Sequence, residues 1–264
     1  MDKSQYKNVY VFVEQRDGVV QNVALELLGK ARELADALHE QVIALLLGKG
    51  VKDKADELIA AGADVVLSIE ADELAQYTTE PYAQAITQVI HERKPSILLI
   101  GATSIGRDLG PRLSARIGTG LTADCTGLDI SEDGDLLMTR PAFGGNLMAT
   151  IICKEHRPQM STVRPGVMRA KAADPTRKGK VEDVKINFDK SKFRVRILET
   201  VKEQKNMIDI TEAKVLVSGG RGVGTAEGSR PCASLRRARC RSIGFACDGR
   251  CRYSRTRATG RTDR

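Results

Sequence analysis

A glycine-rich turn with one arginine follows a short apolar run, and these residue types could bind an anion. The run is Val215 to Val217, and the turn is Ser218-Gly219-Gly220-Arg221-Gly222. Glycines let the backbone approach a ligand closely, and a guanidinium can donate forked hydrogen bonds to it. Many α/β domains bind an anionic cofactor in this way, at the end of a strand. A plain structural turn is the alternative, because the spacing is not that of the G-x-G-x-x-G dinucleotide motif.

A second candidate site is the loop 101–106, with Ser104 and Arg107 beside it. It follows an apolar run, 95–100, and ligands of doubly wound sheets bind beyond the carboxyl ends of strands. The plainer alternative is that the loop only caps the helix that comes after it.

Alternating elements in the first 117 residues must position the second of these candidate sites. Apolar runs predict buried strands, and helical spacing with its start and stop residues predicts helices between them. The strands are expected at 9–13, 42–47, 63–69 and 95–100, and the helices at 24–38, 52–61, 79–94 and 107–117. This alternation predicts an α/β fold with a doubly wound, mainly parallel sheet.

Short strand-like segments replace this alternation after Gly118. They stand at 124–130, 136–140, 148–153, 160–164, 184–188 and 193–200, with a polar loop at 171–180. The first four predict an extension of the sheet or a β appendage. We divide the chain into an N-terminal α/β domain (1–200), a linker (201–212), the start of a second α/β domain (213–228) and a C-terminal segment (229–264).

The C-terminal segment differs sharply in composition from the rest of the chain. Its 36 residues hold eleven Arg, no Lys, two acids and four of the six Cys, while residues 1–228 carry 31 basic and 32 acidic residues. The formal charge of +8 therefore belongs to this segment, and a nucleic-acid function would rest on it alone. The spacing of its cysteines, without a nearby His, does not predict a metal site. These are Cys232, Cys240, Cys247 and Cys251.

Other classes of function find little support in the sequence. There is no run of 18 apolar residues, so we expect no membrane insertion, and the N-terminus has no signal-peptide pattern. Residues 1–228 contain only Cys125 and Cys153, which suits the cytoplasm. The three histidines, His39, His91 and His156, are isolated and expected to be surface or packing residues, so no catalytic residue is assigned.

Several motifs, taken as a set over about residues 1–228, resemble the α subunit of electron transfer flavoproteins. They are the segments 101–116, 121–126, 139–146, 157–160, 162–166 and 217–222. The resemblance implies a heterodimer with a related β subunit. It also implies an N-terminal α/β domain followed by a Rossmann-like domain that holds FAD. Such proteins carry electrons between dehydrogenases, such as acyl-CoA dehydrogenases, or NADH and a further acceptor. Residues 162–168 resemble the anaerobic, NADH-using and sometimes bifurcating branch.

By this resemblance, Arg221 contacts FAD, and Gly219, Gly220 and Gly222 shape the turn around it. No further residue can be assigned to the flavin, because the family's other contacts fall beyond the matching part. Three arginines lie in β segments that the family uses near the β subunit, where interface contacts or internal ion pairs are expected rather than catalysis. They are Arg140, Arg157 and Arg164.

The C-terminal segment departs from the family. There the flavin domain continues with segments like Val-Asp-Ala-Gly and Gln-Val-Gly-Gln-Thr-Gly. Read one base later, with suitable synonymous codons, residues 247–252 and 255–264 give both segments in the expected order. We therefore expect 229–264 to be a frameshift product that is disordered. Two other functions remain as alternatives: a nucleotide-binding α/β domain without redox function, and a basic interaction protein driven by this segment.

Overall fold

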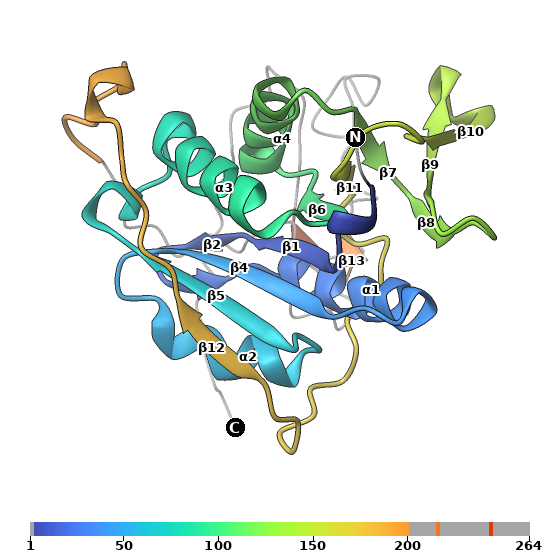
Figure 1. The fold of residues 1–264 in the computed structure, drawn as a ribbon, viewed down its shortest axis with the longest axis horizontal. Helices are drawn as coiled ribbons and strands as arrows, with labels where there is room; N and C mark the ends of the chain where they lie inside the picture. The colour runs from blue at the N-terminus through green and yellow to red at the C-terminus, as the bar shows by residue number, and fades with distance from the viewer. Residues whose placement is uncertain (1–2, 201–214, 217–242, 245–264) are drawn as a thin grey trace, which may run out of the picture. The chain divides into compact units, whose positions relative to one another are not determined.

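A seven-stranded sheet organises residues 1–196, the first of two units into which the chain divides (Figure 1). The computed structural model describes residues 3–200, 215–216 and 243–244. Every strand pair in the sheet is parallel, and the strand order is β12-β5-β4-β1-β6-β11-β7. In the second unit, 197–264, the backbone of β13 (Val215–Leu216) pairs in parallel with β14 (Ile243–Gly244).

The strands and helices of the first unit alternate through its N-terminal part. The sheet strands are β1 (Val9–Val13), β4 (Val42–Gly48), β5 (Val65–Glu70), β6 (Ile97–Gly101), β7 (Leu121–Cys125), β11 (Gln159–Val163) and β12 (Lys180–Asp183). The helices are α1 (Asn22–Leu38), α2 (Ala55–Ala60), α3 (Thr79–Arg93) and α4 (Ser104–Ile117). Short 3₁₀ turns are η1 (Lys3–Gln5), η2 (Lys52–Lys54), η3 (Asp72–Leu74), η4 (Phe143–Gly145) and η5 (Lys190–Lys192). A hairpin is formed by β2 (Gln15–Arg16) and β3 (Val19–Val20).

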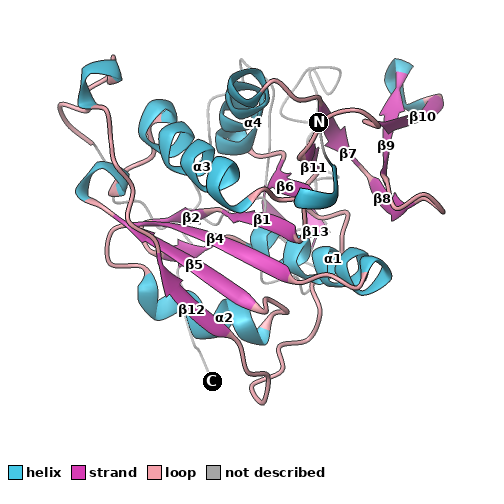
Figure 2. Cartoon of the chain, viewed as in Figure 1, coloured by secondary structure: helices cyan, strands magenta, loops and turns pink. Residues whose placement is uncertain are grey.

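The sheet is buried on both faces, as a parallel sheet must be. Along β1, Val9 and Val11 belong to one buried cluster, and Tyr10 and Phe12 belong to another. The first cluster contains the apolar residues of α1 and α2, and the second contains those of α3 and α4. Figure 2 shows the helices on either side of the strands. Because successive side chains of a strand point to opposite faces of the sheet, one run of apolar residues contributes to both cores.

A separate three-stranded antiparallel sheet extends the domain. Its order is β10 (Leu147–Ile152), β9 (Leu136–Ala142) and β8 (Gly127–Ile130). Leu128 and Met138 from this sheet join the core on the α1 side. The edge strand β10 is different, because Leu147 and Met148 are 57% and 60% exposed, and Phe143 beside it is 83% exposed. The appendage is therefore anchored through β8 and β9, and leaves apolar side chains of β10 uncovered.

The predicted doubly wound, mainly parallel α/β sheet is confirmed, with several local corrections. The predicted strand 124–130 is two strands, because β7 joins the parallel sheet and β8 joins the antiparallel one. The predicted strand 160–164 lies inside the main sheet as β11, between β6 and β7. The helix expected at 52–61 starts as the 3₁₀ turn η2, and α4 starts at Ser104.

Two predicted strands, 184–188 and 193–200, are wrong. Within the described range 184–200 the only regular element is η5, and the strand that joins the sheet edge is β12, just before. The apolar residues of the first segment have another role. Val184, Ile186 and Phe188 pack against the core on the α3 side without a partner strand. The predicted linker (201–212) and most of the segments 213–228 and 229–264 lie outside the described residues.

Replacing Gly106 by Ala tests how closely α4 packs on β6. A Cβ atom at this position would lie 1.8 Å from the carbonyl oxygen of Gly101, so backbone would have to move. We expect Gly106→Ala to lower the free energy of unfolding by about 3 kcal/mol, measured by urea denaturation of the full chain. The control is Gly127→Ala, whose Cβ would meet Thr139 at an ordinary 3.4 Å. Equal losses in the two variants would contradict the close packing.

Candidate functional site

The switch point of the sheet lies between β1 and β6, where the strand order reverses direction. From β1 the chain proceeds to β4 and β5 on one side, and then crosses to β6 on the other. The carboxyl ends of such neighbouring strands form a crevice, which is the usual ligand site of doubly wound folds. The residues that follow β1 and β6 are Glu14 and Ala102.

Side chains of this chain fill that crevice. Glu14 is only 1% exposed, and its carboxylate accepts hydrogen bonds from Arg16, at 2.9 and 3.1 Å, and from the hydroxyl of Thr103. Two glycines at the edge have no free space beside them. A Cβ on Gly48 would lie within 3.0 Å of both Val51 and Gln15, and one on Gly101 would lie 2.8 Å from Val23. A buried carboxylate and close side chains do not suit a phosphate-bearing ligand.

The loop 101–106 caps the helix that follows it. Thr103 is the N-cap of α4, and its hydroxyl accepts a hydrogen bond from the N–H of Gly106 at 3.1 Å. Arg107 donates through Nε to the carbonyl oxygen of Ala102 at 2.9 Å, and Ser104 is exposed. The structure therefore agrees with the plainer interpretation, in which this loop caps the helix that follows it.

Asp124, at the carboxyl end of β7, lies close to two arginine side chains. Its carboxylate accepts two hydrogen bonds from Arg164, at 2.6 and 3.2 Å, and Arg107 approaches to 3.5 Å. The hydrogen bond from Arg164 lowers the pKa of Asp124, burial raises it, and the charges of Arg107 and Arg140 lower it further, so that the result lies below the ordinary value. The residue has a left-handed backbone (φ 62), which Asp tolerates better than most residues.

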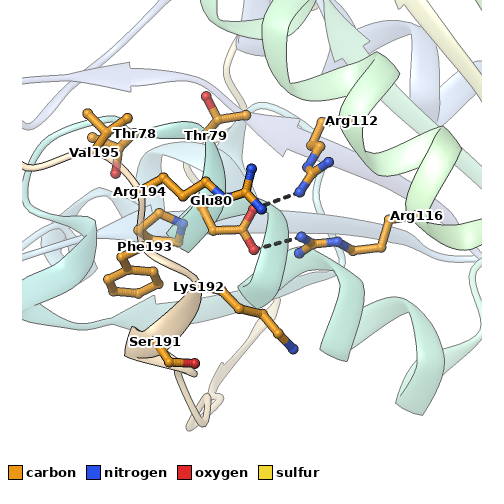
Figure 3. A pocket seen from close by; sticks show the side chains of 11 residues that line it. Thr78, Thr79, Glu80, Arg112, Arg116, Ser191, Lys192, Phe193, Arg194 and Val195 are labelled. Atoms are coloured by element: carbon orange, nitrogen blue, oxygen red, sulfur yellow. Dashed lines mark hydrogen bonds and ion pairs between the residues drawn. The ribbon is translucent and has the colours of Figure 1, made fainter.

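A second group of charges lines a cavity of about 550 Å³ at the start of α3. Arg112 and Arg116, one turn apart on α4, donate to the two oxygens of Glu80 at 3.1 and 2.6 Å (Figure 3). Burial raises the pKa of Glu80, but hydrogen bonds from Arg116, Gln84 and Arg112 outweigh it and hold the pKa below its ordinary value. One carboxylate thus serves two guanidinium groups.

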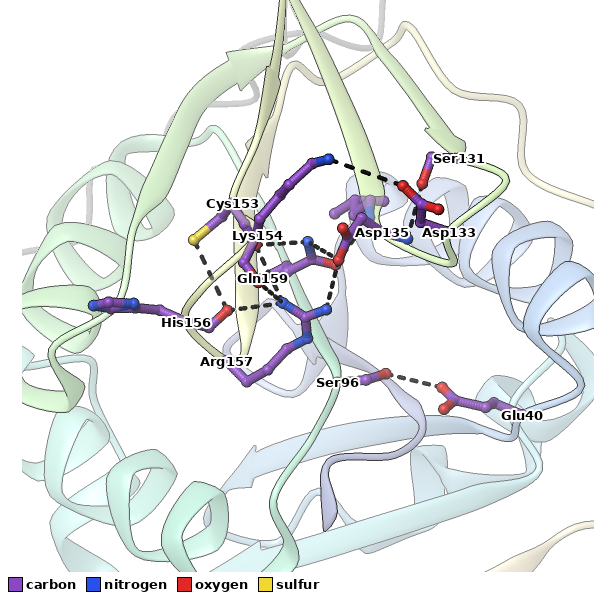
Figure 4. A network of polar contacts seen from close by, with 11 residues as sticks. Glu40, Ser96, Ser131, Asp133, Asp135, Cys153, Lys154, His156, Arg157 and Gln159 are labelled. Atoms are coloured by element: carbon purple, nitrogen blue, oxygen red, sulfur yellow. Dashed lines mark hydrogen bonds and ion pairs between the residues drawn. The ribbon is translucent and has the colours of Figure 1, made fainter. Parts of the chain in front are cut away.

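A buried polar network joins the antiparallel sheet to β11 (Figure 4). Arg157 donates to Asp135 at 2.6 Å, and both side chains are 9% exposed. The other terminal nitrogen of Arg157 donates to the carbonyl oxygens of Cys153 and His156, each at 3.1 Å. Gln159 donates to Cys153 O at 2.9 Å and accepts from the N–H of Leu136 at 2.9 Å. The buried charge is therefore both paired and hydrogen-bonded.

Cysteine, histidine and metal chemistry have no centre in the part of the chain that the structure describes. Burial raises the pKa of the Cys125 thiol to about 11, so this thiol is unreactive. His39, His91 and His156 are exposed, as predicted for surface residues. Among residues 3–200 no group of three or more acidic, His or Cys side chains could hold a metal ion. None of the helices found in the described residues is long and apolar enough to cross a membrane.

Comparison with known proteins identifies the family. Residues 9–189 match the model of the electron transfer flavoprotein domain. The chain belongs to the electron transfer flavoprotein family. Electron transfer flavoprotein subunit alpha of Thermoanaerobacterium thermosaccharolyticum is 53% identical over 225 residues, 85% of this chain and 68% of the relative. The corresponding subunit of Clostridium acetobutylicum is also 53% identical, over 230 residues, 86% of this chain and 68% of the relative.

A third relative has a more specific name. The lactate dehydrogenase (NAD(+),ferredoxin) subunit LctC of Acetobacterium woodii is 44% identical over 223 residues, 84% of this chain and 53% of that protein. Together these matches make the chain a flavoprotein of the alpha-subunit type with a role in electron transport. The alternative of a nucleotide-binding domain without redox function is not favoured.

The predicted flavin residues of this electron transfer flavoprotein subunit lie outside the described residues. They are Gly219, Gly220, Arg221 and Gly222. Of the strand predicted before them, the structure describes the backbone of β13. The described crevice between β1 and β6 does not fit a flavin, because the buried carboxylate of Glu14 would repel its phosphates and Val23 occupies the space beside Gly101.

Sequence reasoning identified the arginines of this flavoprotein subunit but not their partners. Interface contacts or internal ion pairs were expected for Arg140, Arg157 and Arg164, and the structure shows internal ion pairs for Arg157 and Arg164. Their partners Asp135 and Asp124 were missed, and so was buried Glu14. A single acid directly after the apolar run 9–13 was the one signal for Glu14, because that position is at the carboxyl end of a strand.

Removing the Arg157 guanidinium should destabilise the domain strongly. Arg157→Met keeps the length of the side chain but leaves Asp135 buried without its cation, which costs about 3–5 kcal/mol. Urea denaturation of the full chain measures the loss. Lys154→Met is the control, because Lys154 is a neighbouring exposed cation at 3.9 Å from Asp133, and its loss should cost less than about 1 kcal/mol. Similar losses for both variants would rule out a special role for the buried pair.

The Asp124–Arg164 pair should give a pH-dependent contribution to stability. Because the folded-state pKa of Asp124 lies below its ordinary 3.8, the contribution is full above that pH and is lost as the pH falls through the folded-state value. Asp124→Asn keeps a residue that tolerates the left-handed backbone. We expect it to cost under about 1 kcal/mol at neutral pH, because Arg164 is half exposed, and almost nothing near the acid end. An unfolding free-energy difference that stays constant with pH would contradict this.

Proposed function

We propose that this protein, with its C-terminal segment restored to the reading frame of the family, holds FAD at the turn 218–222 and pairs with an electron transfer flavoprotein beta subunit. In this complex it passes electrons between a dehydrogenase, such as an acyl-CoA dehydrogenase, or NADH and a further acceptor. The observation that carries the proposal is the family match over 9–189, together with the Ser-Gly-Gly-Arg-Gly turn. Both described cysteines are unpaired, which suits a cytoplasmic location.

Arg221 is the residue that we assign to the flavin. FAD supplies the redox chemistry, and the protein tunes its potential through nearby charge. We expect the guanidinium of Arg221 to stabilise the negative charge that a flavin gains on reduction. Gly219, Gly220 and Gly222 allow the backbone of the turn to lie close to the cofactor.

The names of the relatives indicate only the chemical class of the electron donor and acceptor. The name of the Acetobacterium woodii relative specifies NAD(+) and ferredoxin as its redox partners. The acryloyl-CoA reductase electron transfer subunit beta of Anaerotignum propionicum is 42% identical over 247 residues, 84% of this chain and 67% of that protein. We therefore favour NADH and a CoA-ester dehydrogenase or reductase among the partners of this chain.

The domain division completes the proposal. Residues 1–200 form the N-terminal domain, 201–212 the linker and 213–228 the start of the FAD domain. Residues 229–264 are proposed to be a frameshift product, supported by the change of composition at Ser229 and by the family segments readable in the next frame. Reading independent clones of the gene across the codons for 227–230 tests this: a single intact frame in all of them would refute the frameshift.

The test of the proposed function is flavin content. The chain is co-expressed with the beta subunit, both as it stands and with its tail restored to the alternative frame, and the FAD bound to the alpha subunit is measured. We expect only the restored version to hold FAD there. In the restored version, Arg221→Ala should weaken FAD binding about tenfold or lower its potential, and Arg221→Lys should recover part of the loss.

Two outcomes would contradict the proposal. Flavin in the chain as it stands would show that the last 36 residues belong to a working FAD domain. Unchanged flavin content and redox titration in Arg221→Ala would remove Arg221 from the site.

A further inference from the structure

The cavity at the start of α3 lies wholly within residues 78–195 and uses none of the residues assigned to the flavin. Three elements meet there: the first turn of α3, the side of α4 and the segment 191–195. Segments far apart in the sequence thus build one concave surface of about 550 Å³, a volume in the range of small-molecule sites.

Positive charge is in excess in this cavity. Its lining includes four cationic side chains, Arg112, Arg116, Lys192 and Arg194, and a single carboxylate, Glu80. Glu80 already accepts from both Arg112 and Arg116. Lys192 is paired with Asp189 at 3.1 Å. Arg194, in contrast, has no hydrogen-bond or ion-pair partner among the described residues, and it points into the cavity in Figure 3.

The start of α3 adds to this positive potential. Thr78 is the N-cap of the helix, but its side chain makes no capping hydrogen bond. The first-turn N–H groups and the helix dipole favour negative charge at this end, and Glu80 is the acid that the first turn itself supplies. Both Thr78 and Thr79 line the cavity, so helix end and guanidinium groups face the same space.

Apolar surface lines the same cavity. Phe193 is half-buried, with its ring 6.4 Å from that of Phe188 in an edge-to-face arrangement. Pro81 and Val195 complete this part of the wall. A bare inorganic anion would leave this wall unused, whereas a molecule that joins a phosphate to a flat ring would contact both parts.

We propose that this cavity binds a phosphate-bearing small molecule of the nucleotide class. The phosphate lies between Arg112 and Arg194 at the start of α3, and the ring lies against Phe193. Arg112 and Arg194 supply forked hydrogen-bond donors that suit phosphate oxygens. Glu80 holds Arg112 and Arg116 in place. Because Arg112 and Lys192 are more than half exposed and Arg194 is also exposed, the affinity depends on ionic strength.

Titration calorimetry of the full chain with ADP tests the proposal. ADP should bind more tightly than inorganic phosphate at low salt, adenosine should not bind, and added salt should weaken the ADP signal. Arg194→Ala should weaken ADP binding about tenfold or more, and this side chain has no partner whose loss could disturb folding. Arg112→Ala should have a similar effect.

Two control variants separate this site from general charge effects and from the flavin site. Arg93→Ala removes the same charge from the far end of α3, where Arg93 pairs with Glu182 at 3.1 Å, and should leave ADP binding unchanged. Arg221→Ala should also leave it unchanged. No ADP binding, an equal loss in Arg93→Ala, or a loss confined to Arg221→Ala would each overturn the proposal. The last result would place ADP in the flavin site and leave the proposed function intact.

Discussion

A parallel sheet exposes apolar side chains on both faces, and the need to cover both faces determines where the helices of this domain lie. In β1 and β4 every residue is buried, so helices are required above and below. Right-handed crossovers from one strand to the next place α1 and α2 on one face and α3 and α4 on the other. The crevice between β1 and β6, the cap of α4 by Thr103 and the meeting of α3 with α4 all follow from this two-sided cover.

A second constraint is electrostatic and concerns the antiparallel sheet. β8 and β9 reach the core only on the α1 side, and the turn between them brings Asp135 under Arg157. A carboxylate and a guanidinium buried together must satisfy each other and the surrounding backbone. The carbonyl oxygens of Cys153 and His156 and the amide of Gln159 complete that set. Apolar contacts place the appendage against the domain, and this network connects it to β11 through Gln159.

Local patterns predicted the elements whose causes are local. The apolar run 9–13 matches β1, and the apolar stripe 24–38 matches α1. In both cases the pattern of burial depends on residues that are close together in the sequence. Hydrogen bonding between neighbouring strands, in contrast, depends on residues that are far apart in the sequence. Apolar residues do alternate at 184–188, but this segment has no partner strand, and its apolar side chains pack against the core without forming a strand. The place of β11 between β6 and β7 depends on strands remote in sequence.

The same limit applied to the sites. The four-residue spacing of Arg112 and Arg116 on a predicted helix was visible in the sequence. Their convergence with Arg194 depends on the path of segment 191–195 past α3, which no periodicity encodes. Interface contacts and internal ion pairs were both open expectations for Arg157 and Arg164. Which carboxylate each guanidinium pairs with is a property of the tertiary structure.

The uncovered edge of the appendage has a consequence for how the purified subunit behaves in concentrated solution. One edge of the first unit's main sheet is β12, whose Lys180, Glu182 and Asp183 discourage other strands from adding to it. β10 ends the smaller sheet without any charged residue, and Leu147, Met148, Ile151 and Ile152 are all exposed. Open backbone groups beside apolar side chains form a template for strand addition. Made without a partner to cover it, the subunit should self-associate through this strand, to an extent that increases with its concentration.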